Sequence, residues 1–382
     1  MGHDLVTLFL CGDVMTGRGI DQILPHPGDP RLREAHVPDA TAYVALAEAA
    51  GGPIPRPVDP AWPWGDALTV LEEAAPDVRL INLETSITRS SDFAPGKAVH
   101  YRMNPANIAC LTVARPDVCA LANNHVLDFG RAGLAETLGT LAGAGLRTAG
   151  AGRDAAEAQR AAVVSLAGGG RVTVVSCGAA SSGIPRRWAA AAAGPGVNLL
   201  PSLSRHSADR LAGQARAGGQ PGDIVVVSVH WGSNWGYEVG PDQAAFARRL
   251  IEGGVDLVHG HSSHHPRPIE VYRGKLILYG CGDFIDDYEG ITGYREYRDD
   301  LRLAYLASLR RGTGELAALR MIPLQSRRLR LWPAIGQDRR WLAAAIDRAS
   351  RPFGSRVELE PGGALVLGPA LAAGHGQAQR WE

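Results

Sequence analysis

The chain has 382 residues, 45% of them hydrophobic, which is enough for a large core and suggests one large domain with additions, or two domains. Its 39 Lys and Arg residues balance 39 Asp and Glu residues, so the formal net charge is zero. This balance excludes a global field that would attract nucleic acid or an anionic membrane, and any charged ligand must therefore be bound locally.

Short apolar runs alternate with helical patterns along the chain, which is typical of an α/β layered fold. In chain order, the predicted strands are Leu5–Cys11, Val78–Leu83, Val118–Ala122, Ala162–Leu166, Val172–Cys177, Ile224–Val229, Leu257–His259 and Leu276–Gly280. The predicted helices are Ala40–Ala49, Trp64–Glu73, Pro105–Ala114, Ala132–Ala142, Ser204–Ala217, Pro241–Ile251 and Asp338–Ser350.

Two stretches interrupt this alternation. Residues 25–63 are rich in proline, which fixes φ, and they form either an ordinary long loop or a cover over a site. After about Arg311 arginines become dense, which usually indicates a solvated face, with a cradle for phosphate or carboxylate as the alternative. We expect a main domain over residues 1–312, a C-terminal extension packed on it over 313–370, and a disordered tail over 371–382.

The first apolar run, Leu5–Cys11, is too short to span a bilayer and lacks the flanks of a signal peptide. No later segment has about twenty uninterrupted apolar residues. The five cysteines are odd in number, form no C-x-x-C pair and mostly lie in apolar runs, where cysteine acts as a small buried hydrophobe. We therefore expect a cytoplasmic protein without a membrane anchor.

Polar side chains follow five of the predicted strands. In an open α/β sheet the carboxyl ends of the strands meet at one edge, where ligands bind, so we expect these side chains to converge. They are Asp13 in "GDVM", Glu84 in "NLETS", Asn123, Asn124 and His125 in "NNHVLDFG", His230 in "HWG", and His261 and His264 in "GHSSHH".

Residues 259–265 hold four of the 12 histidines, which indicates either a polar turn or a metal site. Carboxylate, amide oxygen and imidazole are ligands that Mn, Fe or Zn accept. Two such ions about 3.5–4 Å apart can activate a water and clamp the transition-state oxygens. Singly, each residue can also be a turn former or a hydrogen-bonded core residue. Burying so many polar groups together requires compensation, which a cation supplies.

His125 has a separate predicted role, because it directly follows Asn124. If the asparagine faces a metal ion, an imidazole beside it can donate a proton to a leaving group near neutral pH. Structural support of the site is the alternative. Asp128 is predicted to orient the loop or this histidine, so His125 and Asp128 form the predicted catalytic pair.

The motifs in this order, completed by "ILYGCGDF", resemble the CapA family of poly-γ-glutamate capsule synthesis proteins, part of the calcineurin-like metallophosphoesterase superfamily. The resemblance covers roughly residues 5–310. It implies an α/β fold, specifically a four-layer αββα sandwich with the metal site at the strand ends. It also implies His125 as the catalytic histidine, and as metal ligands Asp13, Glu84, Asn124, His230, His261 and His264.

Three features depart from the patterns of the superfamily and the family. Met15 stands where the superfamily often has a histidine, which weakens one metal position and allows a single ion. The final pair is spaced Gly-His-Ser-Ser-His, so His265 can take the place of His264. Asp283 stands where the CapA family usually has asparagine, and adds either a ligand or a negative charge.

We therefore predict a metallohydrolase that uses one or two divalent ions (Mn, Fe or Zn) to activate a water toward a phosphoester or an amide or γ-glutamyl bond. Arginines after Tyr294 favour a small-molecule or peptide-like, anionic substrate, and no nucleic acid is expected. One alternative is a non-catalytic component of poly-γ-glutamate or capsule polymer synthesis, which Met15 favours. The other is a biosynthetic enzyme that uses the same site for condensation or cyclisation.

Overall fold

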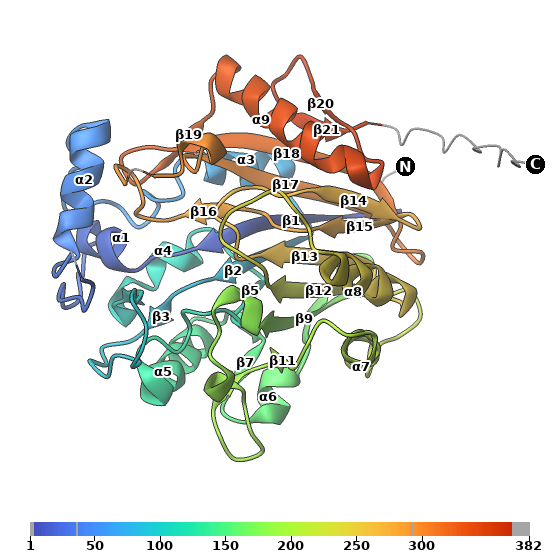
Figure 1. Ribbon diagram of the computed structural model, residues 1–382, viewed down its shortest axis with the longest axis horizontal. Helices are drawn as coiled ribbons and strands as arrows, with labels where there is room; N and C mark the ends of the chain where they lie inside the picture. The colour runs from blue at the N-terminus through green and yellow to red at the C-terminus, as the bar shows by residue number, and fades with distance from the viewer. Residues whose placement is uncertain (1–3, 36, 292, 369–382) are drawn as a thin grey trace, which may run out of the picture.

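Two large β-sheets with helices around them make up the structure, a computed structural model that describes residues 4–35, 37–291 and 293–368 (Figure 1). This arrangement confirms the prediction of an α/β fold. The tail predicted over residues 371–382 lies outside the described residues.

Ten strands of the described residues form the larger sheet. In chain order they are β1 (Leu5–Val14), β2 (Val78–Leu83), β5 (Val118–Ala120), β6 (Arg147–Ala149), β16 (Asp283–Ile285), β17 (Leu301–Arg310), β18 (Leu316–Ser326), β19 (Leu331–Pro333), β20 (Val357–Leu359) and β21 (Leu365–Leu367). Their order in space is β20-β21-β18-β17-β1-β2-β5-β6, with β16 paired to β1 and β19 paired to β18. Strands β1, β2, β5 and β6 run parallel to one another.

In the part of the chain that the structure describes, the smaller sheet has seven strands. They are β8 (Ala162–Ser165), β9 (Arg171–Ala179), β11 (Leu199–Leu200), β12 (Ile224–His230), β13 (Leu257–His261), β14 (Ile269–Tyr272) and β15 (Lys275–Leu278). Their order is β11-β9-β12-β13-β15-β14, with β8 paired to β9. Two short ribbons stand apart, one of β3 (Ser86–Ile87) with β4 (Arg102–Met103), the other of β7 (Ala151–Gly152) with β10 (Gly196–Val197).

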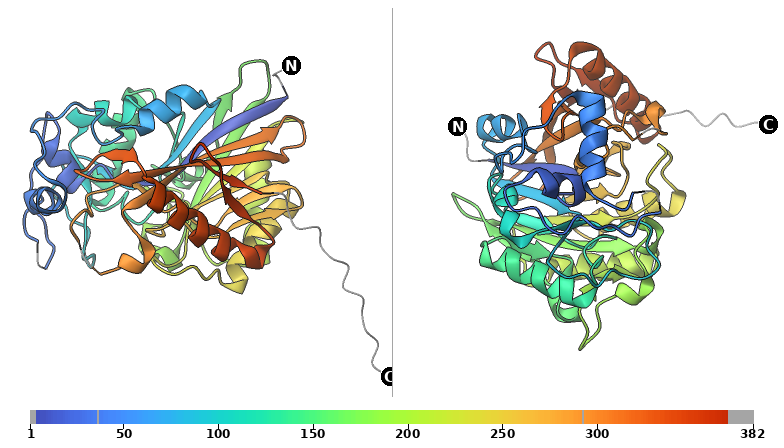
Figure 2. Two further views of the ribbon diagram at one scale, coloured as in Figure 1. Left: turned by 90° about the horizontal axis from the view of Figure 1, so that it is seen from above. Right: turned by 90° about the vertical axis from the view of Figure 1, so that its left-hand side faces the viewer.

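Helices connect the strands and cover the outer faces of the sheets (Figures 1 and 2). They are α1 (Arg18–Ile23), α2 (Thr41–Gly51), α3 (Ala67–Ala74), α4 (Ala109–Thr112), α5 (Gly130–Gly143), α6 (Ala155–Gln159), α7 (Arg205–Arg216), α8 (Pro241–Glu252) and α9 (Gly336–Ser350). The last of these, α9, contacts β20 of the larger sheet and β14 of the smaller one. None of the helices in the described part of the chain combines the length and apolar character that a bilayer crossing requires.

Three apolar clusters hold these layers together, and strand β1 shows how the sequence creates them. Successive side chains of a strand point to opposite faces of the sheet. Leu8 and Leu10 pack in a cluster that contains residues of both sheets, whereas Phe9 and Cys11 pack with α1 to α5 on the other face. The third cluster joins the smaller sheet to α7 and α8. Both faces of the central strands are therefore buried, which explains their nearly continuous apolar runs.

All eight predicted strands are present, and the differences at their ends matter for the site. Strand β1 continues through Val14, β12 through His230 and β13 through His261, so the polar residues occupy the last positions of these strands. Helix α1 was not predicted from the sequence. The hairpin of β17 and β18 was not predicted either, although β17 carries buried apolar residues at every second position, 301, 303 and 305. The expected boundary at residue 312 falls inside this hairpin.

The proline-rich stretch is tied to the main body by Arg18, whose side chain is buried. Its guanidinium donates to both carboxylate oxygens of Asp287, and to the side chains of Glu34 and Tyr43 within the stretch. The Tyr43 ring also lies against this guanidinium, 3.8 Å from ring centroid to Arg18 Cζ. Residues 25–63 are thus held against the segment that follows β16.

We expect Arg302→Met to lower the free energy of unfolding by about 3–5 kcal/mol, because it leaves the buried carboxylate of Asp286 without its cation. Arg302 is 1% exposed and Asp286 is 3% exposed, and the two form an ion pair. Arg320→Met on β18 is the matched control, since the Arg320 side chain is exposed and its pair with Glu360 is 3.6 Å long. Urea unfolding of both variants tests this, and equal losses would contradict it.

Candidate metal centre

The parallel strands of each sheet place polar residues side by side at their carboxyl ends. In the larger sheet Asp13 of β1 lies opposite Asn82 of β2, and in the smaller sheet His230 of β12 lies opposite His261 of β13. The two sheets pack face to face through a shared core, so their carboxyl ends meet at one edge of the molecule (Figure 1).

Asp13, His230 and His261 form the centre of this cluster. Each contributes one ligand atom to a group whose members all lie within 4.8 Å of one another. The Asn82 amide donates to Asp13 Oδ1 at 2.7 Å, while the buried Asp13 Oδ2 has no hydrogen-bond partner in the described residues. A buried carboxylate oxygen without a partner is costly unless a cation or water meets it.

Glu84 and Asn124 approach the same imidazole. The Asn124 Oδ1 atom lies 2.9 Å from His230 Nε2, and Glu84 Oε1 lies 3.6 Å from that nitrogen. The other nitrogen of His230, Nδ1, lies 2.7 Å from His261 Nδ1. Glu84 Oε1 is also 3.8 Å from His125 Nε2. Glu84 therefore lies between the residues of the larger sheet and those of the smaller sheet.

The electrostatics of the cluster fit a cation. Burial raises the pKa of Asp13 to about 6, and burial together with the Asp13 charge raises the pKa of Glu84 well above its usual range. Burial lowers the pKa values of His230 and His261 well below the usual range, which favours the neutral form of both rings. Neutral imidazoles and crowded carboxylates are the donor set that a divalent ion requires, and its charge would offset the repulsion.

The side chains of His264 and His265 have different hydrogen-bond partners. His264 Nδ1 lies 3.0 and 3.1 Å from the two carboxylate oxygens of Asp283, inside the cluster. His265 uses both ring nitrogens elsewhere: Nε2 accepts from the Gly236 N–H at 3.1 Å, and Nδ1 donates to the Pro266 carbonyl at 3.0 Å. The other nitrogen of His264, Nε2, accepts from the Asn234 amide at 2.8 Å, so what distinguishes His264 from His265 is its contact with Asp283, the strand neighbour of Asp13.

His125 and Asp128 form the predicted pair beside the cluster. His125 Nδ1 lies 2.6 Å from Asp128 Oδ2, which leaves Nε2 directed toward Glu84. Lys97 donates to the Asp128 carboxylate and to the Asn124 carbonyl, and the Tyr101 ring stacks on the imidazole with 3.7 Å between centroids. Burial and the Lys97 charge lower the pKa of His125, while burial raises that of Asp128 to about 6.

Asn123 was expected among the converging polar residues, without an assigned role. Its amide donates to Asn82 Oδ1 at 3.1 Å and to the Leu83 carbonyl at 2.8 Å, so it supports the strand ends. Asn82, Lys97 and Tyr101 were not identified from the sequence, although Asn82 is part of the motif "NLETS". Lys97 and Tyr101 come from an irregular segment without periodicity, and no sequence signal marks them.

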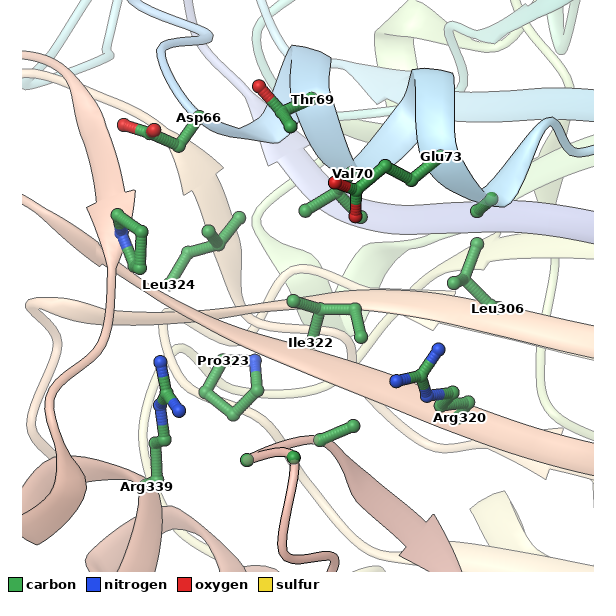
Figure 3. A pocket seen from close by; sticks show the side chains of 15 residues that line it. Asp66, Thr69, Val70, Glu73, Leu306, Arg320, Ile322, Pro323, Leu324 and Arg339 are labelled. Carbon is green, nitrogen blue, oxygen red and sulfur yellow. The ribbon is translucent and has the colours of Figure 1, made fainter.

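A separate pocket of about 320 Å³ lies away from this cluster, between α3 and the strands β17 and β18 (Figure 3). Its floor is apolar, formed by residues such as Leu306 and Ile322, and the charged groups of Asp66, Glu73, Arg320 and Arg339 surround it. None of the residues of the candidate metal centre lines this pocket. The pocket is therefore separate from the candidate metal centre.

These features define an α/β protein with a candidate metal centre of Asp and His residues at the strand ends. The chain belongs to the family of bacterial capsule synthesis proteins known as PGA_cap, whose sequence profile matches residues 7–288. The predicted resemblance to the CapA family is thereby confirmed.

Relatives of known name agree with this membership. The chain is 56% identical over 368 residues to a probable polyglutamine synthesis accessory protein of Mycobacterium tuberculosis, covering 96% of this chain and 97% of the relative. It is 31% identical over 235 residues to the PGA biosynthesis protein CapA of Bacillus subtilis, covering 61% and 58%. It is 22% identical over 303 residues to the capsule biosynthesis protein CapA of Bacillus anthracis, covering 79% and 64%.

Proposed function

We propose that this protein is a metal-dependent hydrolase, and that its two packed sheets with outer helices are the four-layer αββα sandwich of the metallophosphoesterase type. The observation that carries the proposal is the group of Asp13, His230 and His261, in which Asp13 Oδ2 has no partner among the described residues. Glu84, Asn124 and His264 adjoin this group and complete the proposed ligand set. A bound divalent ion (Mn, Fe or Zn) supplies an activated water and positive charge to the transition state.

The protein groups around the centre supply orientation and proton transfer. Asp128 fixes the His125 ring through Nδ1, and Tyr101 covers one face of the ring, so Nε2 is held toward the centre. Burial and the Lys97 charge favour the neutral ring, so Nε2 would take up the proton that the attacking water releases and pass it to the leaving group. A phosphoester and an amide or γ-glutamyl bond both suit this arrangement, and we propose a small or peptide-like anionic substrate.

Metal content tests the proposal first. We expect protein purified without chelator or affinity nickel to contain about one to two equivalents of Mn, Fe or Zn per chain, measured by elemental analysis. Metal-loaded protein is then expected to hydrolyse members of a panel of phosphoesters and γ-glutamyl amides, and removal of the metal by chelator is expected to abolish that turnover. Absence of bound metal after reconstitution with each ion would overturn the proposal.

A second candidate function is a non-catalytic accessory role in poly-γ-glutamate or capsule polymer synthesis. Two observations favour it: the Mycobacterium tuberculosis relative is named an accessory protein, and Met15 stands where the superfamily often has a histidine ligand. Under this function the centre binds metal and stabilises the fold but has no turnover. Metal binding that raises the melting temperature, without hydrolysis of any panel compound, would support the accessory role over the hydrolase.

A further inference from the structure

The pocket between α3 and the C-terminal strands leaves an apolar part of the larger sheet uncovered (Figure 3). In the antiparallel pairing of β17 with β18, Leu306 lies opposite Arg320 and Ala304 lies opposite Ile322, so these side chains share one face of the sheet. Helix α3 covers this face in part, since Val70 and Ile322 are only partly buried. The volume of about 320 Å³ lies within the range of about 300–1,000 Å³ that is usual for ligand sites.

Helix α3 supplies an acidic wall, which consists of Asp66 and Glu73. The two residues are seven positions apart, which is about two helical turns, so both carboxylates lie on the side of α3 that faces the pocket (Figure 3). Asp66 Oδ2 lies 3.5 Å from an Arg330 nitrogen. Glu73 forms no ion pair with any residue that the structure describes, so its charge is available to a ligand.

The opposite side of the pocket is a basic wall, which consists of Arg320 and Arg339 (Figure 3). Arg339 Nε donates to the Ala334 carbonyl at 2.6 Å. The turn between β20 and β21 lies against the same guanidinium, because a Cβ atom added to Gly363 would be only 2.0 Å from Arg339 Nη1. These contacts fix the position of the guanidinium, and none of the described carboxylates pairs with it.

Opposite charges thus stand on opposite walls of an apolar floor, and Glu73 and Arg339 do not pair with each other. A purely apolar ligand would leave both charges unused, and a simple anion or cation would match one wall only. We propose that the pocket binds a short apolar peptide with free ends. Its ammonium group lies at the acidic wall, its carboxylate lies at the basic wall, and its side chains cover the floor. This site is independent of the candidate metal centre.

Calorimetric titration of the full chain with the dipeptide leucyl-leucine tests the proposal. Three related compounds each lack one feature: the N-acetylated dipeptide lacks the ammonium group, the C-terminal amide lacks the carboxylate, and glycyl-glycine lacks the apolar side chains. We expect each of the three to bind at least about 10-fold more weakly than leucyl-leucine, because each loses a charged contact or the apolar contact. Absence of leucyl-leucine binding would overturn the proposal, and so would equal affinity for the acetylated and amidated forms.

Glu73→Gln and Arg339→Gln show whether the two walls act as proposed. Their matched controls are Glu72→Gln and Arg340→Gln, which change exposed neighbours that do not line the pocket. We expect the first two variants to weaken leucyl-leucine binding by at least about 10-fold and the controls to leave it unchanged. Glu73→Gln is expected to leave the weak binding of the acetylated dipeptide as it is, since that ligand has no ammonium group to lose.

Two further measurements complete the test. Thermal unfolding verifies that each variant is folded, and elemental analysis is expected to show unchanged metal content in all four, because the pocket shares no residue with the metal centre. Equal losses in Glu73→Gln and Glu72→Gln would overturn the proposal. Self-association of the wild-type chain in sedimentation, abolished by Glu73→Gln, would also overturn it, because the occupant of the pocket would then be a second copy of the chain.

Discussion

His230→Ala is expected to lower metal affinity by more than about 100-fold and to abolish turnover, since even a residue that only orients a metal ligand is worth about 10–100-fold. His230 contacts three members of the cluster: its Nε2 atom lies 2.9 Å from Asn124 Oδ1 and 3.6 Å from Glu84 Oε1, and its Nδ1 atom lies 2.7 Å from His261. Loss of the ring removes a ligand and breaks the link between the two sheets. Metal titration and turnover measured on the same preparation test this result.

Two further variants make this test specific. His206→Ala on α7 removes an exposed imidazole, and is expected to leave metal content and turnover unchanged. Asp13→Asn retains the volume of the side chain while removing its charge, and is expected to reproduce the loss seen with His230→Ala. Normal metal content and turnover in both Asp13→Asn and His230→Ala would refute the hydrolase proposal.

His125→Ala is expected to reduce kcat by about 10²–10⁴-fold while metal content remains at the wild-type level, because proton transfer to a leaving group typically contributes that much. The ring lies beside the proposed ligands, with Nε2 3.8 Å from Glu84 Oε1, but its Nδ1 atom is engaged by Asp128 at 2.6 Å. Elemental analysis and steady-state kinetics on the same sample separate this effect from metal loss.

Comparing substrates with different leaving groups tests whether His125 acts as a proton donor. A substrate whose leaving group is a weak base needs little proton donation, so His125→Ala is expected to cleave a p-nitrophenyl ester with a smaller loss than an alkyl ester. Asp128→Asn is expected to show the same pattern with a smaller effect, because it alters the orientation of the ring and not its presence. An equal loss on both esters would assign His125 to structural support.

The sequence indicated that Asp13, His230 and His261 lie at strand ends, because each comes at or shortly after the end of an apolar run. Asp13, His230 and His261 occupy terminal strand positions, and the parallel pairing of their strands makes them neighbours. The α/β class followed from the same alternation of runs and helices. These predictions needed only local periodicity and the rule that parallel strands end at one edge.

Other parts of the site depend on tertiary structure and were beyond a sequence argument. His264 and His265 follow Ser262, which adopts φ of 99°, a conformation unusual for serine, and their rings have different neighbours, Asp283 for His264 and Gly236 for His265. Lys97 and Tyr101 reach the site from an irregular segment whose course is fixed by its packing, including the Tyr101 N–H bond to Asp128. No spacing in the sequence indicates either placement.

Because of the hairpin of β17 and β18, the folded domain extends beyond the region that matches the family profile. The family profile ends at residue 288, yet β17, which begins at Leu301, pairs with β1 along positions 5–10. A piece of the chain cut where the likeness ends would leave the strand that carries Asp13 with an open edge, a template for aggregation. Chimaeras that exchange residues 7–288 between relatives should therefore carry the C-terminal strands with them.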